Sequence, residues 1–164
     1  MGLVMNSGTL IFFCGKMGSG KSTKSKQVTT ERNAVLISED DWLATLYPGE
    51  ISTLDEYLHY SKRLKPLLHT HVENLLRTGT NVVMDFPANT KRQRAWFKQL
   101  ISSAEVPYEL YYLEASDELC LKQIAQRQIE QSQRAIFDTE AVFNQVNKHF
   151  EPPHESEGLK ITYG

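Results

Sequence analysis

The residues best suited to chemistry lie in one short stretch near the N-terminus. Residues 15–22 read Gly-Lys-Met-Gly-Ser-Gly-Lys-Ser and fit the phosphate-binding pattern G-x-x-x-x-G-K-[ST]. Glycines let the backbone approach phosphates closely, and N–H groups at a helix N-terminus attract anions. We expect Lys21 to reach the β- and γ-phosphates, Ser22 to ligate Mg²⁺ and Thr23 to contact the α-phosphate. The motif therefore predicts that a nucleoside triphosphate and Mg²⁺ are bound through Gly15, Gly18, Ser19, Gly20, Lys21, Ser22 and Thr23.

Acidic residues follow two later apolar runs. Residues 38–41 read Ser-Glu-Asp-Asp, and three adjacent acids beside a phosphate site are unfavourable unless they have a task. One carboxylate could accept the proton of an attacking hydroxyl as a general base; alternatively, Ser38 or Asp40 caps the following helix. Asp85 follows Val-Val-Met at the position of a Walker B acid, which holds Mg²⁺. The alternative for Asp85 is a strand-end acid that accepts hydrogen bonds from a loop.

Basic residues form a third group, because phosphoryl transfer needs cations to offset charge on the transferring group. Arg127 and Arg134 are candidates for this role, the alternative being a solvated helix face. The densest basic and aromatic cluster could contact a phosphate-bearing substrate or a nucleic acid backbone, or else form the exposed start of a helix. It contains Lys91, Arg92, Arg94 and Trp96.

Five short apolar runs must position these residues, and each is typical of a buried strand: 10–14, 34–37, 81–85, 108–113 and 161–163. Helices are predicted between them, over 21–31, 40–47, 53–77, 90–102, 117–131 and 139–150. Thr53 and Thr90 each open a capping box, and Pro66 predicts two helices or a kink within 53–77. Alternating strands and helices indicate a parallel sheet with ligands at the carboxyl ends of its strands.

The composition is that of one ordinary globular domain. The chain has 164 residues, 40% of them hydrophobic, and a net charge of −2, which gives no general attraction to nucleic acid or acidic lipid. No run approaches the length of a membrane span, and no targeting signal is evident, so we expect a cytoplasmic protein without membrane contact. Cys14 and Cys120 are interpreted as reduced, buried thiols.

Together, the motif, the acids at 38–41, Asp85 and the later arginines resemble the small P-loop kinases. This group includes polynucleotide 5′-kinase domains, chloramphenicol phosphotransferase and zeta-toxin sugar-nucleotide kinases, and its members are often catalogued as AAA-type ATP-binding proteins. The resemblance implies a three-layer α/β P-loop fold with a mainly parallel five-stranded sheet in the order 2-3-1-4-5. It also implies that Asp40 is the general base, with Asp41 as the weaker candidate. Arg127 best matches the arginine that stabilises the transferring phosphoryl group, and Arg134 is second.

The expected architecture is a single domain over residues 1–164, with a lid at about 127–140 and an acceptor-side insertion at about 49–77. The expected function is a kinase that transfers the γ-phosphoryl group of ATP to a hydroxyl of a small molecule or nucleotide. The alternatives are a polynucleotide 5′-hydroxyl kinase, a toxin-like sugar-nucleotide kinase and a non-enzymatic, nucleotide-gated binding module. A nucleic acid acceptor is disfavoured, because polynucleotide kinases carry a basic residue where Trp42, Leu43 and Ala44 stand here.

Overall fold

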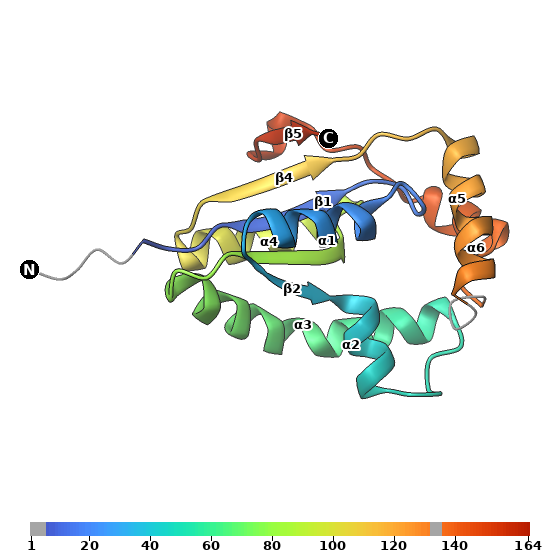
Figure 1. Cartoon of the computed structure of the whole chain (residues 1–164), viewed down its shortest axis with the longest axis horizontal. Coiled ribbons are helices and arrows are strands. Elements are labelled where there is room, and N and C mark those ends of the chain that lie inside the picture. Colours follow the sequence, from blue (N-terminus) through green and yellow to red (C-terminus); the bar gives the residue numbers. More distant parts are fainter. Residues whose placement is uncertain (1–5, 132–135) are drawn as a thin grey trace, which may run out of the picture.

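A computed structural model describes residues 6–131 and 136–164 of the chain. Its described part contains a five-stranded sheet in the order β2-β3-β1-β4-β5, and every strand pair is parallel. The sheet therefore has the order that the kinase resemblance implied and is entirely parallel (Figure 1). The strands are β1 (Leu10–Cys14), β2 (Val35–Ser38), β3 (Val82–Pro87), β4 (Tyr108–Tyr112) and β5 (Ile161–Tyr163).

Strand β1 forms the centre of the molecule, and all five of its residues are fully buried. Alternate side chains of a strand point to opposite faces, so Phe12 and Phe13 belong to different halves of the core. Parallel strands require crossover connections, which place helices on both faces and exclude water from both. This explains why β1 reads as an uninterrupted apolar run.

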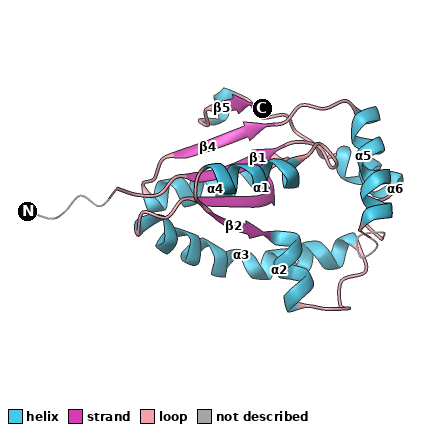
Figure 2. Ribbon diagram, viewed as in Figure 1, coloured by secondary structure: helices cyan, strands magenta, loops and turns pink. Residues whose placement is uncertain are grey.

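Helices cover the two faces of the sheet and crowd its carboxyl end (Figure 2). One face packs against α1 (Lys21–Glu31) through Val28, and the other packs against α3 (Leu54–Arg77) and α4 (Lys91–Ala104). Phe97 of α4 stacks on Phe12 with ring centroids 4.3 Å apart. The remaining helical elements are α2 (Glu39–Leu46), α5 (Asp117–Glu130), α6 (Glu140–Asn147) and the 3₁₀ turn η2 (Glu155–Glu157).

The helix starts follow local signals, but Pro66 does not divide α3. The predicted capping boxes are present at Thr53 and Thr90, where each hydroxyl accepts a hydrogen bond from the N–H three residues later. The prediction of two helices is wrong, because α3 continues from Leu54 to Arg77. A proline inside a helix costs about 3 kcal/mol, and the buried stripe on both sides of it offsets this cost. That stripe consists of Ser61, Leu64, Leu68, Val72 and Leu76.

Both cysteines are buried and free, as the sequence predicted. Cys14 ends β1, and Cys120 lies in α5. Burial raises the pKa of the Cys14 thiol to about 11, so this group stays protonated at neutral pH. Within residues 6–131 and 136–164, no helix is long and apolar enough to cross a membrane.

Candidate active site

The phosphate-binding motif forms the connection between β1 and α1. Gly18 and Gly20 have positive φ angles of 79° and 97°, which side-chain-bearing residues rarely adopt. A Cβ atom on Gly18 would also lie 2.6 Å from the carbonyl oxygen of Cys120, so the loop packs too closely against α5 for any larger residue. Gly20 is the N-cap of α1 and provides no side-chain cap, which leaves the first N–H groups of the helix for another acceptor.

Lys21 folds back over the loop. Its ammonium group donates to the carbonyl oxygens of Gly15 and Lys16, the second at 3.1 Å. Burial lowers the pKa of Lys21 from 10.5 to about 8, although the nearby Asp85 carboxylate acts in the opposite direction. A buried cation with two carbonyl partners can exchange them for a ligand of opposite charge.

Ser22 and Asp85 meet where α1 begins beside the end of β3. The Ser22 hydroxyl donates to Asp85 Oδ2 at 2.8 Å, which joins the two residues expected to hold Mg²⁺. A hydroxyl and a carboxylate suit this hard cation, which usually takes few protein ligands and completes its shell with water and phosphate oxygens. Among the described residues, His, Cys, Asp and Glu form no group of three or more that could hold a metal by itself.

Two further features of the loop fit a bound polyphosphate. The Ser19 hydroxyl is buried and has no hydrogen-bond partner within the described part of the chain, so a bound acceptor would satisfy it. The N–H of Gly15 donates to Asn89 Oδ1 at 2.9 Å, which ties the start of the loop to the segment after β3. Gly15, Gly18, Ser19 and Gly20 thus lie in the connection between β1 and α1, and Lys21, Ser22 and Thr23 form the first turn of α1.

The acids after β2 divide into three environments. Ser38 pairs with Asp85 in the parallel register of β2 and β3, which brings the start of α2 close to Asp85. Ser38 is also the N-cap of α2 and accepts from the Asp41 N–H at 3.4 Å, so the capping interpretation is present as well. Glu39 is 1% exposed, Asp40 is half-buried and Asp41 is exposed.

Tyr57, in the segment 49–77 that was expected on the acceptor side, joins two of these acids. Tyr57 Oη lies 2.5 Å from Asp40 Oδ1 and 2.8 Å from Glu39 Oε1, and Ser61 Oγ donates to Glu39 Oε2 at 2.7 Å. Tyr57 and Ser61 are four residues apart on α3 and therefore share a face. This spacing was the signal available in the sequence, but nothing there shows that this face meets α2.

Arg127 lies near the loop and is held by an ion pair. Its guanidinium group donates to both oxygens of Asp138, at 2.9 and 2.6 Å, and Asp138 is 1% exposed. Its positive charge also helps to lower the pKa of Lys21, after burial as the main cause. Next to this pair, the ring of Phe137 contacts the ring of Tyr57 edge-on, with the ring centroids 6.0 Å apart. Arg134, the second candidate, lies outside the described residues.

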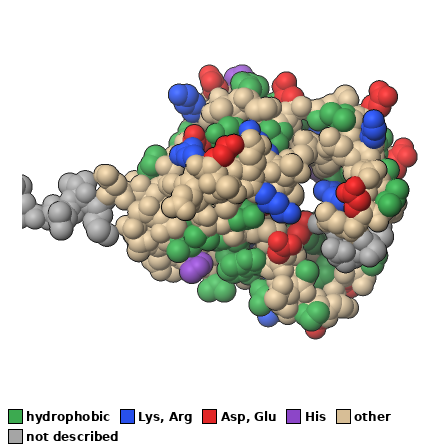
Figure 3. Space-filling view, viewed as in Figure 1, with side chains coloured by type: hydrophobic (Ala, Val, Ile, Leu, Met, Phe, Trp, Pro, Cys, Tyr) green, Lys and Arg blue, Asp and Glu red, His purple; other side chains and the backbone are tan. Residues whose placement is uncertain are grey.

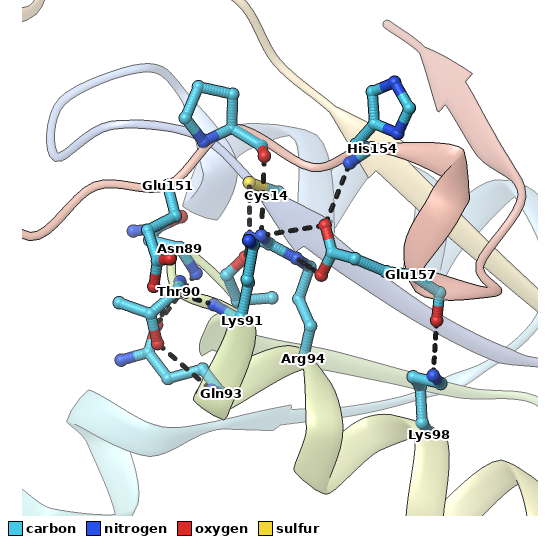
Figure 4. Close-up of polar contacts among 12 residues, drawn as sticks. Cys14, Asn89, Thr90, Lys91, Gln93, Arg94, Lys98, Glu151, His154 and Glu157 are labelled. Carbon is cyan, nitrogen blue, oxygen red and sulfur yellow. Dashed lines mark hydrogen bonds and ion pairs between the residues drawn. The ribbon is translucent and has the colours of Figure 1, made fainter.

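The predicted basic and aromatic cluster does not form a single surface. Lys91 and Arg92 are exposed, but Arg94 is 0% exposed and lies beneath them. Its guanidinium group pairs with Glu157 at 2.8 and 3.1 Å and donates to the carbonyl oxygen of Ala88 at 3.0 Å (Figure 4). The inclusion of Arg94 in a contact surface is therefore wrong, because α4 turns this residue toward the core.

The site faces a hollow at the carboxyl end of the sheet. Figure 3 shows the molecule indented between its main body and the α5–α6 end, with acidic and basic side chains along the edges. A cavity of about 350 Å³ lies beside the phosphate-binding loop, lined by Lys16, Leu113, Ala115 and Phe150 among others. Lys16 reaches across to Asp117, the first residue of α5, at 2.6 Å. Ligands of open parallel sheets gather at this edge.

The sheet order, the phosphate-binding loop and the acid at the end of β3 define the class of small P-loop kinases. Within that class, residues 10–153 match the profile of a family described as AAA domain, and the chain belongs to this family. No curated protein matches the chain.

Several solved structures share the fold. A protein of Chloroflexus aurantiacus has a TM-score of 0.71 at 21% identity, covering 91% of this chain and 80% of its own. Chaetomium thermophilum Kti12, in complex with ADP-AlF3, has a TM-score of 0.64 at 17% identity. The match covers 94% of this chain and 87% of that protein. Mycobacterium tuberculosis APS kinase CysC, in complex with AMPPNP and APS, has a TM-score of 0.58 at 17% identity. The match covers 90% of this chain and 84% of that protein. At these identities the similarity establishes the fold alone.

Proposed function

We propose that this protein is a kinase that transfers the γ-phosphoryl group of ATP to a hydroxyl group of a small molecule or nucleotide. The observation that carries the proposal is the 2.8 Å contact between Ser22 and Asp85, which joins the loop hydroxyl to the acid at the end of β3. The neighbouring strand β2 ends at Ser38, opposite Asp85, and Asp40 follows in the first turn of α2, where its carboxylate would lie beside the γ-phosphate. Two of the proteins with this fold were solved with an ATP analogue or with ADP-AlF3.

Each residue has a distinct role in this proposal. The loop amides, Lys21 and Thr23 bind the phosphates, while Ser22 and Asp85 hold Mg²⁺. When bound, Mg²⁺ neutralises charge on the phosphate oxygens. Asp40 accepts the proton of the acceptor hydroxyl, which attacks the γ-phosphorus as the bond to ADP breaks.

The proposal also includes a cationic lid and an acceptor side. We infer that residues at about 127–140 close over the phosphates and that residues at about 49–77 border the acceptor. Arg127 would then exchange Asp138 for the transferring group, because a phosphoryl oxygen offers the same kind of charged acceptor as a carboxylate. Arg134 remains the second candidate of this lid.

The direct test follows the label from γ-labelled ATP with Mg²⁺ across small hydroxyl metabolites and 5′-hydroxyl oligonucleotides. Wild type should label one acceptor class, and Asp40→Asn should lose transfer while its ATP affinity stays within about threefold. Asp41→Asn provides the comparison that assigns the base to one of the two acids. Loss of nucleotide binding in Asp40→Asn would contradict its assignment as the base.

The alternatives predict different outcomes. Label that stays on ATP despite tight binding would indicate a nucleotide-gated binding module. A polynucleotide kinase would label oligonucleotides, with binding that weakens strongly as salt increases. The burial of Arg94 removes one of the basic residues that favoured this alternative. Growth arrest on expression would favour the toxin-like sugar-nucleotide kinase.

A further inference from the structure

Four side chains of α2 and α3 form a continuous polar chain. Ser61 Oγ contacts Glu39 Oε2 at 2.7 Å, Glu39 Oε1 contacts Tyr57 Oη at 2.8 Å, and Tyr57 Oη contacts Asp40 Oδ1 at 2.5 Å. Glu39 and Ser61 are well shielded, since their exposed fractions are 1% and 5%. The chain ends on the proposed general base.

The number of protons in this chain is constrained. Each oxygen-to-oxygen hydrogen bond contains one proton, and a tyrosine hydroxyl supplies only one. Tyr57 Oη lies within hydrogen-bond distance of two carboxyl groups, so its own proton can occupy only one of the two contacts. The second contact needs a proton on a carboxyl oxygen. With both carboxyls ionised, the single proton of Tyr57 would have to serve two negatively charged oxygens.

The environment selects Glu39 as the group that carries this proton. Burial raises the pKa of Glu39, and the adjacent charge of Asp40 acts in the same direction. The hydrogen bonds from Ser61 and Tyr57 and the charge of Lys65 act in the opposite direction but leave the pKa raised. Burial, together with both acids, raises the pKa of Tyr57 well above its usual value, so the phenol keeps its proton.

We propose that Glu39 is a positioning residue that stays a neutral carboxylic acid, donates its proton to Tyr57 Oη and thereby directs the Tyr57 proton to Asp40. This inference rests on the proposed function for the role of Asp40 as the base. The array fixes the carboxylate of Asp40 in place and keeps the neighbouring acid uncharged, which limits repulsion of the γ-phosphate. During transfer the acceptor proton passes to Asp40, while Glu39 and Tyr57 keep their own protons.

The proton on Glu39 can be observed without any activity assay. Infrared spectra separate the C=O stretch of a neutral carboxyl group from the bands of a carboxylate. At neutral pH, wild type minus Glu39→Gln should show one neutral carboxyl band, and wild type minus Glu118→Gln should show none, because Glu118 is exposed on α5. A difference spectrum for Glu39→Gln that contains only carboxylate bands overturns the proposal.

Kinetics test the positioning role. Glutamine imitates neutral glutamic acid, because its NH₂ can donate to Tyr57 and its carbonyl can accept from Ser61, so Glu39→Gln should keep kcat within about threefold. Tyr57→Phe removes the link and should lower kcat by about tenfold, with KM for ATP unchanged. Tyr163→Phe, which removes a hydroxyl from the exposed end of β5, is the matched control. Equal losses in Glu39→Gln and Tyr57→Phe, or an unchanged kcat in Tyr57→Phe, overturn the role.

The two proposals fail in different ways. If wild type transfers no phosphoryl group to any acceptor, the proposed function fails, and the infrared result still decides whether Glu39 is neutral. If transfer occurs and Asp40→Asn abolishes it, but Glu39 is ionised, the proposed function stands and this inference falls.

Discussion

At the residue scale, the site depends on how far each charged side chain is removed from water. Lys21 is buried against two carbonyl oxygens, Glu39 lies under a tyrosine, and Arg127 is held by Asp138. Burial penalises the charged forms of Lys21 and Glu39, as the directions of their pKa shifts show. Ligand binding and pH should therefore act on the same few side chains.

Nucleotide affinity should decrease as the pH rises, because Lys21 loses its positive charge. Its pKa of about 8 means that the unliganded protein loses this charge within an accessible range. The dissociation constant of a non-hydrolysable ATP analogue should rise between about pH 7 and 9, approaching tenfold per pH unit above the pKa. Isothermal titration calorimetry measures this. Lys21→Met should bind weakly without this trend, and an identical trend in that variant would assign it to another group.

The same shift has a defined effect on stability. Between about pH 8 and pH 10.5, Lys21 is protonated in the unfolded chain and deprotonated in the folded chain. Where the unfolded state binds more protons, stability rises with pH, so the destabilisation caused by burying the charged Lys21 is progressively relieved across that range.

Asp85 should determine the Mg²⁺ requirement. Asp85→Asn keeps an oxygen near Ser22 but removes the negative charge, so the Mg²⁺ concentration for half-maximal nucleotide binding should rise by about tenfold or more. Fluorescence titration with a labelled nucleotide at several Mg²⁺ concentrations measures this. Glu105→Gln removes a carboxylate from the exposed end of α4 and should leave the requirement unchanged. An unaltered requirement in Asp85→Asn would argue against a role in holding Mg²⁺.

Residue types predicted the phosphate-binding loop well, but they did not predict burial. The glycine and lysine spacing encodes a local turn, so residues 15–22 could be placed from the sequence alone. Arg92 and Arg94 look equivalent in the sequence, and only the rotation of α4 exposes one and buries the other. In the same way, the sequence does not separate Glu39 from Asp40 and Asp41. The partners that bury Glu39, Tyr57 and Ser61, come from α3.

At the element scale, α4 is joined to the C-terminal segment through one buried ion pair. Arg94 also lies 3.8 Å from the Cys14 sulfur and donates to the carbonyl oxygen of Ala88, which precedes Asn89. Glu157 accepts from the His154 N–H at 2.9 Å as well (Figure 4). The segment that carries Asn89 thus connects η2 with the start of the phosphate-binding loop.

Breaking this pair should cost more than any nearby surface change. Arg94→Ala leaves Glu157 without its cation and should lower the free energy of unfolding by about 3 kcal/mol or more. Arg92→Ala, on the exposed side of the same helix, should change it by about 0.5 kcal/mol or less. Urea unfolding of both variants measures the difference. Similar losses in the two variants would contradict the structural importance of the pair.

The elements themselves were largely predictable, because strand and helix periodicities are local. The run 10–14 matches β1, while β3 extends to Pro87 beyond the predicted 81–85. Pro66 misled the prediction because its local cost is visible in the sequence, whereas the buried stripe that offsets it requires α3 to lie against the sheet and α4. The strand order came from the resemblance, since no single run encodes its neighbours.

At the scale of the whole molecule, the site is assembled from segments that are far apart in the sequence. The loop after β1, the acids after β2, Asp85 within β3 and Arg127 on α5 meet at one edge of the sheet. The contact between Tyr57 and Phe137 connects the acceptor side with the segment before α6. A ligand at this edge would therefore connect segments that are far apart in the sequence.

Nucleotide should accordingly stabilise the entire fold. At a concentration of 100 times its dissociation constant, a ligand that binds only the folded state adds about 2.7 kcal/mol, which should raise Tm by several degrees. Thermal unfolding with and without the ATP analogue and Mg²⁺ measures this shift. In Lys21→Met at the same ligand concentration the shift should be much smaller. An equal shift in both proteins would place the bound nucleotide elsewhere.

The central position of β1 has a consequence for how the protein is made. Both neighbours of β1, β3 and β4, lie far downstream, so its five buried apolar residues leave the ribosome long before a partner strand exists. With β3 roughly 70 residues later and synthesis at about 5–20 residues per second, β1 waits for several seconds. During that interval the nascent chain presents an unpaired hydrophobic segment of the kind that chaperones bind. Slow codons between β1 and β3 should therefore lower the soluble yield more than slow codons placed after β4.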